Sequence, residues 1–320
     1  MIEQTIQVGN LQLRGRIVMP PMATEQADGG LVTPGMGAYY AARAKNPEIG
    51  LIITEHSYIE MRGKASRGQV SIAENEAIEG LSTITKAIHA AAEGIKVFAQ
   101  INHAGGYTSR DITGTEPVSA SAGILKQEPA RALTKDEILQ IEELFAQAAR
   151  RAQLAGYDGV EIHSAHSYLL NQFYSPLTNH RTDEYGSQTM ENRLRMHLET
   201  IQKVREKVGE NFPIAVRLGG CDYTPGGSTI EDSVEASLLL QKAGVDLLDL
   251  SGGMCRYILE GVSEPGWFGQ MTRQIKQQVN VPVLLTGGIK TRAEAETLLE
   301  QGAADLIGIG RALLKEPLLK

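Results

Sequence analysis

The chain has 320 residues, of which 42% are hydrophobic and 22% charged, and its formal net charge is −7. This composition is typical of a globular protein, and an acidic chain without a dense Lys/Arg stripe argues against nucleic acid as a partner. No run approaches the roughly 18 apolar residues of a membrane span, and the amino end lacks a secretion signal. Two isolated cysteines favour a reducing cytoplasm. A homo-oligomer is compatible with these features.

Residues 5–16 alternate in polarity and turn at Gly9-Asn10, which predicts a β-hairpin. Beyond it, eight short β-prone runs begin near residues 17, 50, 96, 159, 213, 247, 281 and 305. Longer stretches of helical period separate them, as in repeated βα units around a parallel sheet. The pattern predicts one α/β domain over residues 1–320, a (β/α)₈ TIM barrel whose bottom is closed by the hairpin.

Two connecting segments differ in character. A helix is expected from Thr134, which has Glu137 three residues later as a capping box, to Gly156. Residues 105–131, in contrast, are rich in Gly, Ser, Thr and Pro and lack a clear period, so a long loop is expected after the third strand. Loops of this length often carry function.

The active site of a barrel of this kind lies at the carboxyl ends of its strands. The eight ends present mainly polar residues and glycines here: Pro21-Met22-Ala23, His56, Gln100 with His103, His163 with His166 and Tyr168, Arg217, Ser251-Gly252-Gly253, Gly287-Gly288, and Gly310-Arg311. The predicted fold therefore brings polar groups from six strands to one mouth.

Glycines after the last two strands indicate a phosphate site. Gly287-Gly288 and Gly310 let backbone amides approach an anion, a helix amino terminus near Thr291 adds its dipole, and Arg311 adds a charge. The alternative is a tight turn into that helix, with Arg311 pointing to solvent.

Arg217 ends an apolar strand, where an unpaired guanidinium is costly to bury. It needs either an anionic cofactor group or a structural salt bridge to Glu161 or Asp249. Gln100 offers an acceptor and two donors that suit a planar imide edge, although it could also satisfy neighbouring backbone.

His163 and His166 stand three apart, so they converge only if the strand ends between them and the chain turns. Three interpretations remain open: metal ligands with His56 or His103 as a third partner, packed core residues, or two donors to a substrate carbonyl oxygen. In the last case Tyr168 supplies a phenol that could deliver a proton.

Several segments carry a resemblance to a known family: "GRIVMPPMAT", "GLIITEHSYI", "FAQINHAG", "VEIHSAHSYLLNQFYSPLTNHRTDEYG", "ENRLR", "AVRLGGCDY" and "LIGIGRALL". In order and barrel position, over nearly the whole chain, they closely resemble the Old Yellow Enzyme family of flavin-dependent ene-reductases. The barrel is also similar to the amino-terminal halves of larger dienoyl-CoA and bile-acid reductases. The long central segment is the most specific part of the match.

The resemblance implies FMN, with its phosphate at Gly287, Gly288, Gly310 and Arg311, its pyrimidine edge at Gln100 and Arg217, and its central ring against Pro21-Met22-Ala23. His56 is assigned to the cofactor as well. By the same resemblance, His163 and His166 bind the oxygen of an α,β-unsaturated carbonyl substrate and Tyr168 protonates Cα. NAD(P)H is the expected reductant, in a ping-pong sequence.

The sequence departs from the family pattern at several positions. Ala23 replaces a common Cys or Thr, His56 replaces a small residue, and Ser167 replaces the Gly usual before the tyrosine. Two other classes are kept as alternatives: a metal-dependent barrel lyase or hydrolase, and a flavin-binding subunit without turnover of its own.

Overall fold

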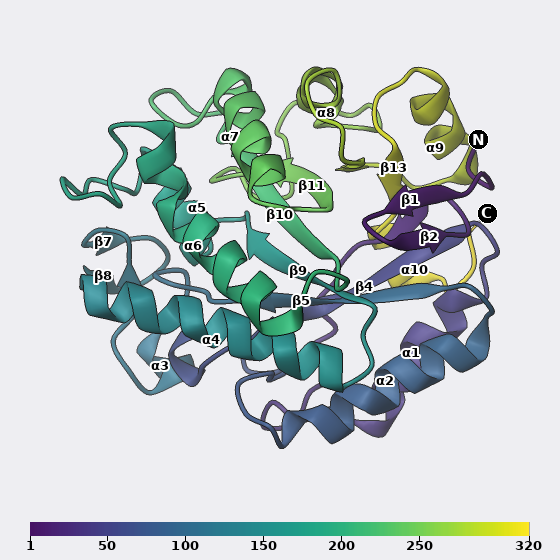
Figure 1. The fold of residues 1–320 in the computed structure, drawn as a ribbon, viewed down its shortest axis with the longest axis horizontal. Helices are drawn as coiled ribbons and strands as arrows, with labels where there is room; N and C mark the ends of the chain where they lie inside the picture. The colour runs from purple at the N-terminus through teal and green to yellow at the C-terminus, as the bar shows by residue number, and fades with distance from the viewer. Residues whose placement is uncertain (320) are drawn as a thin grey trace.

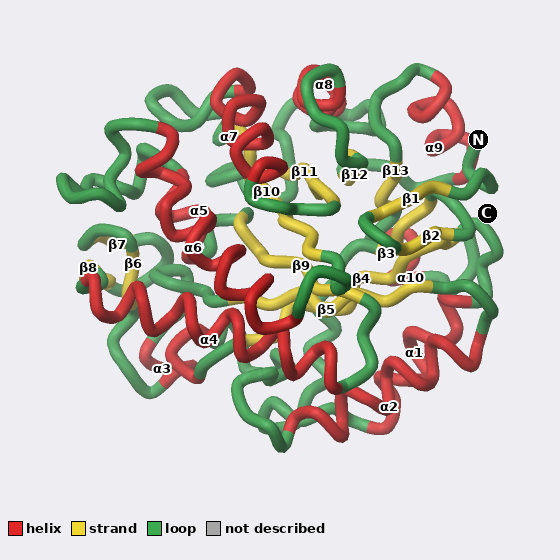
Figure 2. Tube along the Cα trace, in the orientation of Figure 1, coloured by secondary structure: helices red, strands yellow, loops and turns green. Residues whose placement is uncertain are grey.

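The computed structural model describes residues 1–319, whose strands and helices alternate along the chain (Figures 1 and 2). The strands are β1 (Ile6–Val8), β2 (Leu11–Leu13), β3 (Ile17–Met19), β4 (Ile49–Tyr58), β5 (Lys96–Asn102), β6 (Val118–Ser119), β7 (Gly123–Ile124), β8 (Pro129–Ala132), β9 (Gly159–Ser164), β10 (Ile214–Cys221), β11 (Leu247–Gly252), β12 (Val283–Thr286) and β13 (Leu306–Gly308). The helices are α1 (Pro34–Ala44), the 3₁₀ turn η1 (Met61–Gly63), α2 (Ala77–Ala91), α3 (Arg110–Thr113), α4 (Lys135–Leu154), α5 (Leu169–Tyr174), α6 (Met190–Val208), α7 (Ile230–Lys242), α8 (Gly269–Lys276), α9 (Arg292–Glu300) and α10 (Arg311–Lys315).

Strands β3, β4, β5 and β9 to β13 pair in parallel and close into a barrel in chain order. Each of the eight predicted runs contributes one strand, so the predicted (β/α)₈ barrel is confirmed. The first run is shorter than expected: β3 ends at Met19, because Pro20 and Pro21 have no N–H to donate to a ladder.

Inward-facing residues change from apolar to polar along the strands. The lower interior holds a cluster with Leu51, Phe98, Ala215, Leu247 and Leu284, against which Val8 and Leu13 of the hairpin pack. This contact confirms that the hairpin closes the bottom of the barrel, at the right-hand end in Figure 1. Because side chains alternate with a period of two, the next inward positions are Gln100, Arg217, Asp249 and Thr286. The core is therefore apolar below and polar at the mouth.

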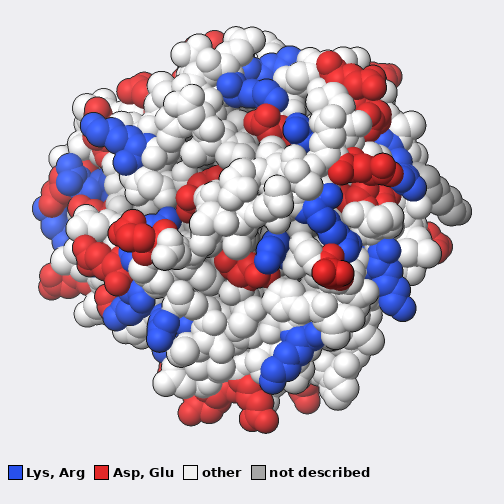
Figure 3. All heavy atoms as spheres, turned by 45° about the vertical axis from the view of Figure 1, so that its right-hand side comes forward, with Lys and Arg blue, Asp and Glu red and all other residues white. Residues whose placement is uncertain are grey.

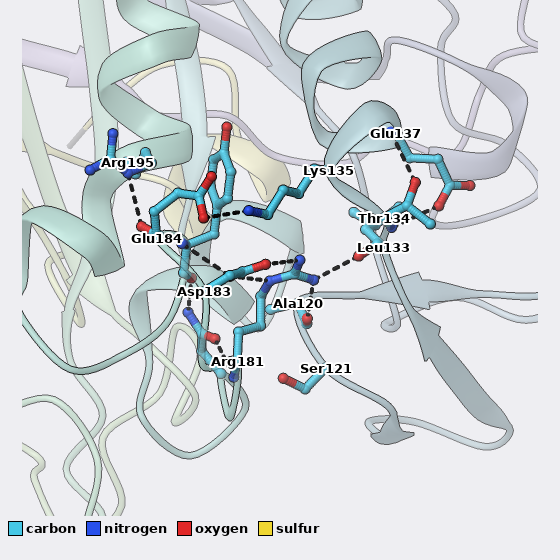
Figure 4. A network of polar contacts seen from close by, with 12 residues as sticks. Ala120, Ser121, Leu133, Thr134, Lys135, Glu137, Arg181, Asp183, Glu184 and Arg195 are labelled. Atoms are coloured by element: carbon cyan, nitrogen blue, oxygen red, sulfur yellow. Dashed lines mark hydrogen bonds and ion pairs between the residues drawn. The ribbon is translucent and has the colours of Figure 1, made fainter.

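The segment 105–131 is not the structureless loop that its composition suggests. It contains α3 and the strands β6 and β7, and these two strands pair with β8 in a small sheet at the end of the molecule opposite the hairpin (Figure 1). Arg181 holds this region: its guanidinium donates to the carbonyl oxygens of Ala120 and Leu133 and pairs with Asp183 at 2.6 Å (Figure 4). Part of the distinctive "NHRTDEYG" segment thus anchors the chain beside the mouth.

The predicted helix from Thr134 is confirmed as α4, with Thr134 and Glu137 forming the capping box. No helix of residues 1–319 combines the length and apolar character that crossing a bilayer demands. On the face drawn in Figure 3, basic and acidic side chains are interspersed.

Candidate active site

The turn after β9 brings the two histidines together. β9 ends at Ser164, and His166 and Ser167 then adopt left-handed backbone conformations with φ of +60° and +68°. Asn171 accepts from the Ser167 N–H at 2.9 Å and Gln172 donates to its carbonyl oxygen at 2.6 Å, so the first turn of α5 fixes the bend. The polar run after the strand therefore does allow the reversal that two residues three apart require.

The rings of His163, His166 and Tyr168 form one cluster. The two imidazole centroids lie 5.1 Å apart, and the Tyr168 ring lies 5.1 Å from that of His163. All three side chains are buried, with exposed fractions of 3%, 7% and 8%. His166 is oriented from the opposite side by Ser251 of β11, whose hydroxyl lies 2.8 Å from Nε2. The buried Nδ1 of His163 has no partner.

The histidines of this cluster are neutral. Burial lowers the pKa of His163 and His166 well below the ordinary value, and Arg217 and Arg256 lower both further. A neutral imidazole still donates one N–H, so the pair can bind a carbonyl oxygen without carrying a charge. Burial also raises the pKa of Tyr168 to about 12, and the phenol therefore keeps its proton at neutral pH.

His56 belongs to the same aromatic group. Its ring stacks on Tyr168 with centroids 5.4 Å apart, and its Nδ1 lies 3.1 and 3.2 Å from the side-chain amides of Asn102 and Gln69. Two amide donors hold Nδ1 as an acceptor, which places the proton on Nε2. Burial lowers the pKa of His56 to about 4. In this arrangement His56 supports Tyr168, a contact that the sequence did not predict.

His103, considered as a further metal ligand, is committed elsewhere. Its Nε2 lies 2.8 Å from a Glu60 oxygen, and its Nδ1 accepts from the Gly105 N–H. Within residues 1–319, no group of three or more His, Cys, Asp or Glu side chains is arranged to hold a metal ion. The histidine pair therefore lacks the third ligand that a metal site would need in this part of the chain.

A charged layer lies in the barrel interior at the level of Arg217. The Arg217 Nε lies 3.1 Å from an Asp249 oxygen, so the salt bridge to Asp249 that the sequence left open is present. The bond direction is poor, and neither Nε nor the Asp249 oxygens have a hydrogen-bond partner. Gln100 donates to Glu161 at 2.7 Å rather than to backbone.

One cation, Arg217, lowers the pKa of two buried acids in this layer, Glu161 and Asp249. Burial raises the pKa of Glu161 well above its ordinary value, and the neighbouring Asp249 raises it further, whereas Arg217 opposes the rise. Burial raises the pKa of Asp249 to about 6, with Arg217 opposing the rise. Because Glu161 accepts from one N–H of the Gln100 amide, the carbonyl oxygen and the second N–H are left for a ligand.

Two of the glycines expected at a phosphate, Gly287 and Gly288, pack against Trp267. Gly288 has φ of +71°, and a Cβ at this position would lie 2.5 Å from the indole Nε1. The Arg311 guanidinium lies over the same indole, 4.8 Å from the ring centroid. Gly310 adjoins the Pro21-Met22-Ala23 segment, because a Cβ at Gly310 would lie 2.9 Å from the Met22 sulfur.

The helix dipole expected near Thr291 is already satisfied internally. α9 does begin there, but Glu294 accepts from the N–H groups of Lys290 and Thr291, and Thr291 accepts from that of Glu294. The first turn of α9 thus caps itself with a carboxylate. A phosphate in this region would depend on the glycine amides and Arg311.

Comparison with known proteins identifies the family. Residues 3–320 match the model of the NADH:flavin oxidoreductase / NADH oxidase family, to which the chain belongs. It is 39% identical to an NADH oxidase of Thermoanaerobacter brockii, covering 97% of this chain and 48% of the relative, and 35% identical to an NADPH dehydrogenase of Bacillus subtilis, covering 98% and 90%. The structure of an Old Yellow Enzyme homologue from Zymomonas mobilis aligns with a TM-score of 0.85 and 30% identity, over 99% of this chain and 90% of that one.

These comparisons confirm the resemblance to the Old Yellow Enzyme family, whose members are flavin oxidoreductases that use FMN and NAD(P)H. The chain spans about half the length of the NADH oxidase that it matches. Its own substrate and activity are therefore matters of proposal.

The site residues fit FMN. Several buried polar atoms of the site lack hydrogen-bond partners, among them Thr286 Oγ1 and Trp267 Nε1. Unsatisfied buried groups are rare in folded proteins, and a bound ligand is one way in which they are completed. Together with the glycines at 288 and 310, where a side chain would collide, they provide contacts for a polar ring system and for its phosphate.

The sequence missed several neighbours of this site. Tyr107, Arg256, Tyr257 and Trp267 lie in loops without periodicity, and no local pattern marks them. Asn102 was detectable, because it follows Gln100 by two residues and so faces the same side of β5.

Proposed function

We propose that the chain uses NAD(P)H to reduce the activated C=C bond of α,β-unsaturated carbonyl compounds, such as enones and enals, in a ping-pong reaction. The observation that carries this proposal is the cluster of two neutral imidazoles and one protonated phenol, in which the ring centroid of His163 lies 5.1 Å from those of both His166 and Tyr168. Family membership supplies the cofactor and the reductant.

FMN, when bound, supplies the hydride that is added to Cβ of the substrate. Gln100 and Arg217 would hold its pyrimidine edge, Pro21-Met22-Ala23 would lie along its central ring, and Gly287, Gly288, Gly310 and Arg311 would hold its phosphate. This assignment uses the Arg217 guanidinium, which lies beside Asp249, and the free carbonyl oxygen of Gln100.

The chain's own residues handle the carbonyl oxygen and the proton. His163 and His166 would donate to the oxygen, on which negative charge develops when the hydride reaches Cβ. Ser251 keeps the His166 ring in place during this step. Tyr168 would then transfer its proton to Cα, which completes the addition of two hydrogens across the double bond.

A visible spectrum and a turnover assay test the proposal. The purified protein should be yellow and should release FMN on denaturation. Anaerobically it should oxidise more NADH or NADPH than one equivalent of its flavin only when an enone is present. Absence of the chromophore would contradict the flavin assignment. A yellow protein that reduces no member of a panel of enones and enals would instead be a flavin-binding subunit.

A further inference from the structure

A guanidinium without a carboxylate partner lies beside this cluster. Arg256, in the segment after β11, donates to the phenol oxygen of Tyr107 at 2.5 Å, and its guanidinium carbon lies 4.5 Å from the centroid of that ring. Its Nε is buried without a partner. Arg256 is partly exposed, and among residues 1–319 no Asp or Glu forms an ion pair with it.

Aromatic contacts connect Arg256 to the reactive residues. The Tyr107 ring meets the Tyr168 ring edge to face, with centroids 5.9 Å apart. Arg256 also lies 5.2 Å from the centroid of Tyr257, whose ring meets that of His166 at 5.7 Å. One aromatic ring therefore separates the guanidinium from the proposed proton donor, and another separates it from the proposed carbonyl clamp.

Arg256 also lines a cavity of about 550 Å³, which is bounded by Tyr223 and Thr224 after β10 and by residues 255–260 after β11. This volume falls within the range of sites that hold drug-sized ligands. Lys126 lies 5.4 Å from the centroid of the Tyr107 ring and adds positive charge, whereas Glu260 places one carboxylate on the cavity wall. A monoanion fits this balance better than a dianionic phosphate, which Glu260 would repel.

We propose that Arg256 binds a carboxylate carried by the substrate, about one aromatic ring away from the reacting double bond. The planar guanidinium matches a carboxylate in two parallel hydrogen bonds, and an anion there would supply the missing counter-ion. The preferred substrates are then aryl-sized, anionic enones. This inference rests on the proposed function and names its substrate class.

A matched pair of substrates tests it. The enone 4-(3-oxobut-1-enyl)benzoate carries a carboxylate one ring from the double bond, and its methyl ester has the same frame without the charge. In the FMN-loaded protein, Arg256→Gln should lower the ratio of kcat/KM for the acid over the ester by about 10-fold or more, the size expected for a charged hydrogen bond. Arg256→Lys, which keeps the charge but loses the fork, should lower the ratio less.

Arg150→Gln is the control, because it makes the same change in net charge at an exposed position on α4. It should leave the ratio unchanged. An unchanged ratio in Arg256→Gln, with the ester still reduced, would overturn the carboxylate site and leave the proposed function intact.

If the unaltered protein reduced neither enone, the proposed function would fail, and binding would decide the role of Arg256. Calorimetry with the saturated acid 4-(3-oxobutyl)benzoate should then show a Kd about 10-fold higher in Arg256→Gln than in the unaltered protein. Equal Kd values would reject the site independently of turnover.

Discussion

Replacing Tyr168 by phenylalanine removes one hydroxyl and keeps the ring packing of the site. The ring contacts His56, His163 and Tyr107 at centroid distances of 5.4, 5.1 and 5.9 Å, and these contacts do not need the oxygen. No described residue hydrogen-bonds to the hydroxyl, so the substitution leaves no buried partner unpaired. The variant should therefore fold and bind FMN as the unaltered protein does.

The loss should fall on proton delivery alone. With a pKa raised to about 12 by burial and opposed by Arg256, the phenol is protonated throughout the neutral range, and its ionisation should not appear in pH–rate profiles there. A positioned general acid contributes about 10²- to 10⁴-fold to a rate. Tyr168→Phe should thus slow enone reduction by about 10²-fold or more, which corresponds to roughly 2.7 kcal/mol of barrier.

Anaerobic stopped flow separates the two half-reactions by the flavin absorbance. Reduction by NAD(P)H should change less than about twofold, since neither hydride donation nor binding uses a proton from Tyr168. Reoxidation by cyclohexenone should carry the whole loss. Tyr58→Phe, at a buried position on β4 outside the cluster, is the matched control and should affect neither. Normal reoxidation in Tyr168→Phe would refute the assignment and make water or another side chain the donor.

Three further substitutions test the cofactor site, a buried histidine and the strained turn. Arg311→Ala should raise the Kd for FMN about 10-fold or more and leave the Kd for riboflavin, which lacks the phosphate, unchanged. Quenching of the fluorescence of Trp267, the chain's one tryptophan, measures both Kd values. An equal effect on the two flavins would place the phosphate elsewhere. Burial lowers the pKa of His197 to about 3. Between pH 3 and about 6.5 the unfolded chain therefore binds more protons at this histidine than the folded chain does, so His197 makes the folded state less stable as the pH falls. The unfolding free energy of the unaltered protein, relative to that of His197→Gln, should drop by about 2–3 kcal/mol from pH 6.5 to 4.5 in denaturant titrations, and a constant difference would disprove the shift. Ser167→Gly should raise Tm, because the left-handed backbone at φ +68° costs a serine about 1–2 kcal/mol and glycine adopts it without that cost. Ser167→Ala keeps the strain and is the control. A Tm of Ser167→Gly no higher than that of Ser167→Ala would show that the turn is unstrained.

Patterns that repeat along the chain made the barrel predictable. Each barrel strand is marked by a short apolar run with helical period on either side, and parallel strands joined by right-handed crossovers close in only a few ways. The same runs end in polar residues such as Gln100, Arg217 and His163, which locates the mouth. The residue types at the strand ends therefore predicted most residues of the candidate site.

The small sheet in 105–131 lacked such a signal. β6 and β7 have two residues each, too short to show a period, and Arg181, which bonds Ala120 and Leu133, lies about 50 to 60 residues further along the chain. A composition rich in Gly, Ser and Pro predicts an irregular loop, and this prediction fails where a side chain from a distant part of the sequence holds the segment in a regular structure. Here the order comes from tertiary contacts.

The same limit explains why Arg217 could be interpreted from sequence and Arg256 could not. Arg217 interrupts an apolar strand, so its neighbours on β9 and β11 follow from the barrel, and both acids in its layer were among the candidates. Arg256 sits in an irregular segment, and its partner Tyr107 is 149 residues away. Its unpaired charge becomes evident only when the mouth is assembled. Loops of a barrel commonly carry binding residues, and local sequence patterns do not describe such loops, so we expect residues such as Arg256 to be found only in the assembled structure.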